Sequence, residues 1–235
     1  MLRKFFPTLL LSLGMLLQAS PAPLRALGLE SAGLLPASIP AGNVPVIPVT
    51  QADLDGNSSP ETLALNGGRL SILSSGEIVW QSPEVWKIVQ AAISDLNRDG
   101  IPEVTLLLWR PFRPWPVDQW LPNGGRISEF RNAEGQSCHI ILIGWTRGGY
   151  HELWAGSAMA DPITFFAVAD LNGNNTQELV ALEGRYTGPK SAPARTLKVW
   201  EWNGFGFTVV SSIDGLFSSI ALVQAKNGRI LMLVP

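Results

Sequence analysis

The sequence predicts an all-β fold made of four-stranded blades of the β-propeller type. A nine-residue polar stretch occurs three times, and short apolar segments flank every copy. These segments are rich in β-branched and aromatic residues and are bounded by turn residues, which is typical of strands. Because repeated four-stranded units are the pattern of propeller blades, we expect about three complete blades and a partial fourth.

The composition indicates a globular protein. The chain has 235 residues, of which 46% are hydrophobic and 15% are charged. That length is enough to bury a core as one large or two small domains. The formal net charge is −2, so there is no basic surplus to attract phosphate backbones. We therefore do not expect a nucleic-acid partner.

The first 28 residues have the pattern of a signal peptide. Arg3 and Lys4 precede an apolar run over residues 5–17, which is too short to span a bilayer. Small residues follow, and residues 26–28 fit a small-x-small cleavage site. We therefore expect residues 1–28 to be removed, with a mature N-terminus near Leu29. The alternative is an uncleaved anchor.

Export follows from this leader. We expect a secreted or extracytoplasmic protein, in the periplasm or at the cell surface, with no stable membrane anchor after cleavage. Residues 29–43 are then a linker or a closing strand, and residues 44–235 form the propeller domain.

The repeated polar stretch has the form D-L-[DN]-x-[DN]-x-x-x-E. It reads DLDGNSSPE over residues 53–61, DLNRDGIPE over 95–103 and DLNGNNTQE over 170–178. We call these stretches loops one, two and three, and we number the places in each from one to nine. Strand-like segments precede and follow every copy, so each loop joins the first two strands of a blade.

The strands can be placed in order along three blades. Turn residues such as SSGE, RGGY and NGFG separate the last two strands of each blade. Blade one, over 44–83, has expected strands 47–52, 62–65, 69–73 and 77–82. Blade two, over 88–162, has expected strands 88–94, 104–109, 139–145 and 151–156. Blade three, over 164–213, has expected strands 164–169, 179–184, 196–202 and 207–213.

The fourth blade is incomplete in the sequence. Residues 218–234 supply two strands joined by a shortened loop without carboxylates. Three ways of closing the ring remain open: residues 29–46 add the missing strands, another copy of the chain adds them, or the sequence is a fragment. Residues 111–137 of blade two are rich in proline and glycine and are expected to form an inserted loop. The alternative is a degenerate blade hidden there.

The polar loops have the chemistry of calcium sites. Calcium takes six to eight oxygen ligands, and alternate side chains in a tight loop point the same way. Places one, three, five and nine then supply side-chain oxygens, and place seven supplies a backbone carbonyl. The expected ligands are Asp53, Asp55, Asn57, Ser59 and Glu61 in loop one; Asp95, Asn97, Asp99, Ile101 and Glu103 in loop two; and Asp170, Asn172, Asn174, Thr176 and Glu178 in loop three.

The three loops are not equivalent. Loops one and two each carry three carboxylates, whereas loop three carries two. Loop two alone has glycine at place six, where a sharp turn requires a positive φ. We therefore expect loop two to be the strongest site and loop three the weakest.

Two other calcium-binding motifs begin with a similar pattern or occur as loop pairs. An EF-hand has its bidentate glutamate at place twelve and flanking helices, and a dockerin-like pair also needs helices. Both disagree with the strands expected here. Metal-free Asx-turn hairpins, in which the place-two leucine fills the core, remain an alternative.

The loops and their flanks resemble the FG-GAP/VCBS repeats of integrin-α-like β-propellers. The resemblance is carried by ADLDGNSSPETLAL, SDLNRDGIPEVTLLLW and ADLNGNNTQELVALEG, and it covers most of residues 44–213. In that family the loop D-x-[DN]-x-D-G-x-x-[DE] binds calcium, so the resemblance implies calcium at the ligands named above. This chain departs from the pattern at place six, with Ser58 and Asn175, and has fewer blades than the family usually has.

Further candidate sites are weaker. Cys138, His139 and His151 lack the spacing of a metal site and fall on expected strands, and a single cysteine excludes an intrachain disulfide. No catalytic motif is visible in the sequence, although paired carboxylates for glycan cleavage have no sequence signature. Aromatic residues in or near the insertion are a candidate surface for binding sugar or protein: Trp109, Phe112, Trp115 and Trp120, near Arg110, Arg113 and Asp118. The alternative is that these rings cover a blade end.

The sequence thus favours a secreted calcium-binding propeller module for recognition or scaffolding, with no catalysis of its own and a protein or glycan as ligand. The alternative is an exported glycan-acting enzyme or a lectin-like carbohydrate-binding protein. An enzyme would need convergent acids outside the calcium loops. The sequence does not indicate an oligomeric state.

Overall fold

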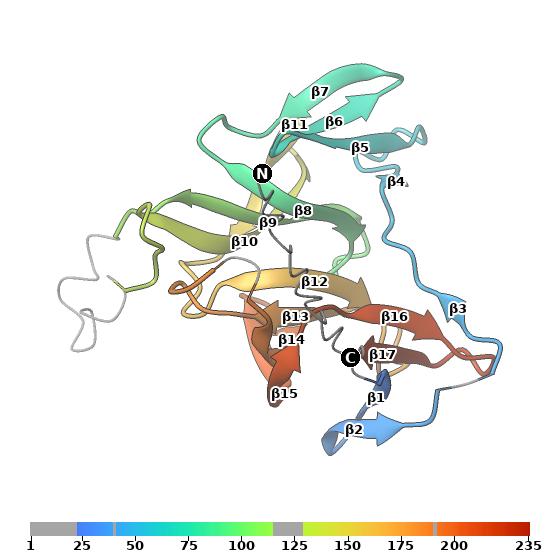
Figure 1. Ribbon diagram of the computed structural model, residues 1–235. Coiled ribbons are helices and arrows are strands. Elements are labelled where there is room, and N and C mark those ends of the chain that lie inside the picture. The colour runs from blue at the N-terminus through green and yellow to red at the C-terminus, as the bar shows by residue number, and fades with distance from the viewer. Residues whose placement is uncertain (1–22, 40, 115–128, 190–191) are drawn as a thin grey trace, which may run out of the picture.

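The computed structural model describes residues 23–39, 41–114, 129–189 and 192–235. Every regular element in these ranges is a β-strand, and the strands form four small antiparallel sheets. The sheets are arranged as the blades of a four-bladed propeller (Figure 1). The prediction of an all-β fold built of propeller blades is confirmed. None of the described residues forms a helix long and apolar enough to cross a membrane.

Blades one to three are four-stranded meanders, as expected. In each, consecutive strands pair in sequence order. Blade one comprises β4 (Gln51–Ala52), β5 (Glu61–Asn66), β6 (Arg69–Ser74) and β7 (Glu77–Gln81). Blade two comprises β8 (Lys87–Ser94), β9 (Glu103–Pro111), β10 (Gln136–Thr146) and β11 (Gly149–Ala155). Blade three comprises β12 (Ile163–Ala169), β13 (Glu178–Glu183), β14 (Ala194–Trp202) and β15 (Phe207–Phe217).

The fourth blade combines both ends of the described chain. Its strand order is β2-β1-β17-β16-β3. The C-terminal pair β16 (Ala221–Gln224) and β17 (Ile230–Val234) is completed by β1 (Arg25–Glu30), β2 (Gly33–Ala37) and β3 (Val44–Pro45). N-terminal strands therefore supply the missing outer strands, which was one of the three closures left open. In Figure 1 the blue and red segments meet in this sheet.

The strand β1 crosses the boundary expected for the leader. Its pairing with β17 consists of Arg25, Ala26 and Leu27, opposite Val234, Leu233 and Met232. Cleavage after residue 28 would remove all of these pairs. A cleavage compatible with the closed ring therefore lies upstream of Arg25.

Two details of blades one and two differ from the expected boundaries. Val44 and Pro45 pair with β16, so they belong to blade four rather than to blade one. In blade two, β9 pairs directly with β10 from Val104 out to Pro111. The insertion therefore leaves from the tip of a long hairpin, and its described parts, residues 112–114 and 129–135, contain no strand.

The first strands of the blades lie closest to the centre of the molecule. The Ile93 N–H of β8 donates to the Val49 carbonyl, and Gln90 of β8 exchanges two hydrogen bonds with the Phe166 backbone of β12. Because these first strands run in the same sense around a propeller, the loops that leave them lie on one face. This face carries loops one, two and three.

Apolar clusters between neighbouring sheets hold the blades together. One cluster joins blades one and two, a second joins blades two and three, and a third joins blades three and four. The place-two leucines of the repeat take part: Leu54, Leu96 and Leu171 are at most 2% exposed. Fully burying such a side chain stabilises a fold by about 1.5–3 kcal/mol, so each polar loop starts from a fixed anchor.

Candidate metal sites

The three loops share one local geometry. In each, the buried place-two leucine donates its N–H to the place-nine glutamate, at 2.8 Å in loops one and two and 2.9 Å in loop three. That glutamate is the first residue of the second strand and is at most 1% exposed. The pairing closes the loop at its base and holds the carboxylate against the loop interior. The glutamates are Glu61, Glu103 and Glu178.

The place-one aspartate organises the turn above that base. Its carboxylate accepts backbone N–H groups from places four to six: Asp53 from Gly56 and Ser58, Asp95 from Asp99 and Gly100, and Asp170 from Gly173, Asn174 and Asn175. Side chains at places three and five accept the N–H two residues on. These are successive Asx-turns, and they turn the alternate oxygens toward one centre.

The turn requires two left-handed residues rather than the single one predicted. Place six has a positive φ in all three loops: 70° at Ser58, 82° at Gly100 and 63° at Asn175. Place four is also left-handed, with glycine in loops one and three and arginine in loop two, where φ is 63° at Arg98. The left-handed conformation at place four was not predicted from the sequence. The glycines at positions 56 and 173 were the available signal.

Two loops bring three carboxylates together. One oxygen each from Asp53, Asp55 and Glu61 lies within 4.8 Å of the others, and the same holds for Asp95, Asp99 and Glu103. Among the described residues, no lysine or arginine lies within ion-pair distance of these six carboxylates. The clusters therefore bring acidic groups together without a basic side chain to compensate them, which disfavours their full ionisation in the folded state.

Glu103 is the most constrained of these carboxylates. Its Oε1 accepts from the Leu96 N–H at 2.8 Å and from Ser94 Oγ at 3.3 Å. Its Oε2 is buried and has no hydrogen-bond partner among the described residues. Burial raises the pKa of Glu103 to about 8, and the charges of Asp95 and Asp99 push it in the same direction.

Loop one is approached by a side chain from the neighbouring blade. Glu61 accepts hydrogen bonds from the Leu54 N–H and from Ser74 Oγ. The Tyr150 side chain, at the start of β11, lies near the Glu61 carboxylate. Burial raises the pKa of Tyr150, and so does the nearby charge of Glu61. Tyr150 thus remains a neutral phenol beside the loop-one carboxylates, and its position had no signal in the sequence.

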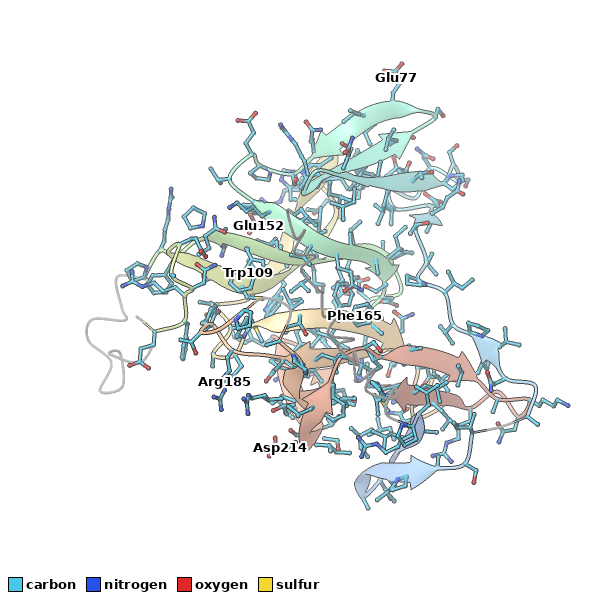
Figure 2. All side chains as sticks on the ribbon, in the orientation of Figure 1. Glu77, Trp109, Glu152, Phe165, Arg185 and Asp214 are labelled. Carbon is cyan, nitrogen blue, oxygen red and sulfur yellow. The ribbon has the colours of Figure 1, made fainter. Side chains whose placement is uncertain are left out.

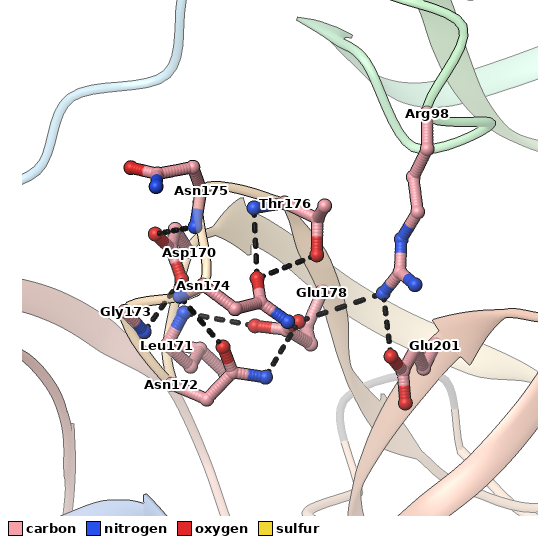
Figure 3. Close-up of polar contacts among 10 residues, drawn as sticks. All are labelled: Arg98, Asp170, Leu171, Asn172, Gly173, Asn174, Asn175, Thr176, Glu178 and Glu201. Atoms are coloured by element: carbon pink, nitrogen blue, oxygen red, sulfur yellow. Dashed lines mark hydrogen bonds and ion pairs between the residues drawn. The ribbon is translucent and has the colours of Figure 1, made fainter.

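Loop three differs from the other two (Figure 3). It has only the carboxylates of Asp170 and Glu178. The Glu178 carboxylate is surrounded by donors: the Leu171 N–H at 2.9 Å, Asn172 Nδ2 at 3.1 Å and Arg98 Nη2 at 3.7 Å. Both of its oxygens are therefore partnered, and a positive charge already lies beside it.

Two of the three weak metal candidates, Cys138 and His139, are buried in the fold, whereas His151 is exposed. His139 is 5% exposed, and its ring nitrogens contact Ser137 Oγ at 2.8 Å and the Gly156 carbonyl at 2.9 Å. Burial lowers the pKa of His139 to about 4. Cys138 is fully buried, and burial raises the pKa of its thiol to about 12. Neither side chain has the exposure or protonation state that a reactive group requires.

The aromatic candidates near the insertion divide into two groups. Trp115 and Trp120 lie outside the described residues. Trp109 packs edge-on against Tyr186 with ring centroids 5.7 Å apart, and Arg131 lies over the Phe112 ring at 5.6 Å. Trp109, labelled in Figure 2, borders a cavity of about 1090 Å³ that is lined by residues of blades two and three. Trp109 thus both packs within the fold and lines a hollow.

Comparisons with known proteins add little to this picture. No family model matches the sequence, and no curated protein matches it. A match among solved structures is the crystal structure of BBS1N in complex with ARL6DN, soaked with mercury. The two chains are 13% identical, the match covers 85% of this chain and 68% of that chain, and the TM-score is 0.31. The fold assignment therefore rests on the strand pairings described above.

Proposed function

We propose that this chain is a secreted calcium-binding β-propeller module of the FG-GAP/VCBS type, used for recognition or scaffolding and without catalysis of its own. The observation that carries the proposal is the buried, unpartnered Oε2 of Glu103 beside Asp95 and Asp99. A buried oxygen without a donor, next to two further carboxylates and no cation, is costly in a folded protein. A bound divalent cation would remove both costs.

The donor set favours calcium over other ions. Loops one and two offer carboxylate, amide and backbone oxygens, with no imidazole or thiolate. Zinc and copper prefer those nitrogen and sulfur ligands, whereas calcium takes six to eight oxygens in a flexible geometry. The proposed ligands are those predicted from the sequence for loops one and two, with Glu61 and Glu103 at the bases of the two sites.

The proposed location agrees with this chemistry. Calcium sites of extracellular modules have dissociation constants of about 10⁻⁴ to 10⁻³ M, which suits loops of three carboxylates exposed at one face of a domain. Calcium in these loops would hold a face of the propeller rigid, as recognition of a protein or glycan ligand requires. Export rests on the basic and apolar leader of the sequence.

The test is thermal unfolding in calcium and in chelator. An ion that binds only the folded state stabilises it by about 2.7 kcal/mol at a hundredfold excess over its dissociation constant. Calcium should raise the melting temperature of the parent. Asp95→Ala should remove most of this rise, Asp53→Ala should remove part of it, and the exposed control Asp161→Ala should retain all of it.

Comparing each variant with itself in the two buffers separates metal binding from the hydrogen bonds that the aspartates also make. If every variant shows the same melting temperature with calcium as with chelator, the loops are metal-free Asx-turn hairpins and the proposal fails.

A further inference from the structure

Loop two departs from the other loops at place four. Gly56 and Gly173 hold that place in loops one and three with φ of 77° in both. Arg98 holds it in loop two with φ of 63°, a conformation that a side chain with a Cβ rarely adopts. The turn geometry alone therefore gives no reason for arginine at this place.

The Arg98 side chain leaves its own loop and reaches blade three. Its Nη2 lies 2.8 Å from Glu201 Oε1 on β14 and 3.7 Å from Glu178 Oε1, the place-nine acid of loop three. The Glu178 side chain is completely buried, and the Arg98 side chain is 24% exposed. Figure 3 shows the guanidinium between the two glutamates. The Glu201 side chain is 35% exposed, so the arginine links a buried and a partly exposed carboxylate across two blades.

Loop three differs from the other loops at place eight, and the residue at that place contacts loop two. Pro60 and Pro102 occupy place eight of loops one and two, whereas loop three has Gln177. The Asp95 N–H, at place one of loop two, donates to Gln177 Oε1 at 2.8 Å. Proline has no side-chain acceptor, so this hydrogen bond could not form if place eight of loop three were proline. Arg98 of loop two thus contacts loop three, and Gln177 of loop three contacts loop two.

We propose that Arg98 is the resident cation of loop three: its guanidinium takes the place of a metal ion beside Glu178 and, with Gln177, clamps loop three to loop two. Loop three then takes no calcium in the intact protein, and the metal ions occupy loops one and two. This inference rests on the proposed function for its metal count, but the clamp itself does not depend on calcium.

The test is Arg98→Gly, which restores the residue found at place four of the other loops. The change removes the guanidinium and relieves the backbone strain. Arg147→Gly is the matched control, because Arg147 is exposed, also has a positive φ (53°) and makes no ion pair among the described residues. Bound ions are counted by titration with calcium and, separately, with terbium, followed by luminescence.

Arg98→Gly should bind one more ion per chain than the parent, and Arg98→Gly/Asp170→Ala should lose it again. The control should bind as the parent does. The proposal is overturned if Asp170→Ala already removes an ion from the parent, or if Arg98→Gly binds no additional ion.

A second measurement remains decisive if no loop binds metal. In chelator, Arg98→Gly should lower the melting temperature by several degrees despite the relieved strain. This drop should be smaller in a Glu178→Gln background, because Arg98 and Glu178 interact while the pair of Arg98 with Glu201 remains. If the drop is the same in both backgrounds, or if the control falls equally, then Arg98 does not neutralise Glu178 and the clamp is refuted. An absence of calcium binding in the parent would refute the proposed function alone.

Discussion

Replacing Glu103 with glutamine should change stability in opposite directions with and without calcium. In the metal-free protein, the raised pKa of Glu103 means that the folded state disfavours the ionised carboxylate. This penalty is absent below the usual pKa of 4.5, grows as the pH rises and is complete near pH 8. At pH 7 it amounts to about 3 kcal/mol, from roughly 1.4 kcal/mol for each pH unit above 4.5.

Glutamine removes this penalty because its amide is neutral. Its Nε2, in place of the unpartnered Oε2, can also donate to Asp95 or Asp99. In chelator at pH 7, Glu103→Gln should therefore raise the melting temperature by roughly 6–12 °C, given about 2–4 °C per kcal/mol for a chain of this size. At pH 5 the gain should shrink to less than about 1 kcal/mol, because this pH lies only slightly above the pKa of 4.5 in the unfolded chain. With calcium, the variant should lose the stabilisation from loop two.

Melting curves followed by circular dichroism in chelator and in calcium, at pH 5 and pH 7, give all four comparisons. Glu77→Gln is the control, because Glu77 lies at the exposed tip of β7 and points away from the protein (Figure 2). It should change neither the pH dependence nor the calcium response. The reasoning is refuted if Glu103→Gln melts at or below the parent in chelator at pH 7, or if it keeps the full response to calcium.

Two further predictions concern the core and the N-terminus. Because the pKa of His139 falls from 6.5 to about 4 on folding, the parent should lose up to about 3 kcal/mol as the pH falls through this range. In urea unfolding, His139→Gln should lack that part of the acid sensitivity; equal losses in both proteins would contradict the prediction. Mass spectrometry of the exported protein should find a mature N-terminus upstream of Arg25, because β1 pairs with β17 through Arg25, Ala26 and Leu27. An intact Met1 in a cytoplasmic fraction would contradict export.

Local features of the fold could be predicted from the sequence. The repeated loops and their apolar flanks locate the strands of blades one to three, because the alternation of turn residues and β-branched segments is encoded within a few residues. The buried leucine at place two and the alternating oxygens are equally local, and the structure places both as the repeat implies. Calcium binding by these loops stays a prediction.

Features that depend on pairing between distant residues could not be predicted. Ring closure joins β1 to β17 across most of the chain, and β1 begins within a segment whose composition indicates a leader. The contacts from Arg98 to Glu178 and Glu201, and from Gln177 to Asp95, cross between blades. Their only sequence signal is that arginine replaces glycine at one place of the repeat and glutamine replaces proline at another. The meaning of these replacements appears only when the loops lie side by side.

Counting the calcium ions bound by the parent protein tests the central claim most directly. Equilibrium dialysis at millimolar calcium should retain one ion in loop one and one in loop two, with Asp53→Ala and Asp95→Ala each losing one ion and Asp161→Ala losing none. Retention of no calcium by the folded parent, or equal retention by all three variants, would contradict the assignment of these loops as metal sites.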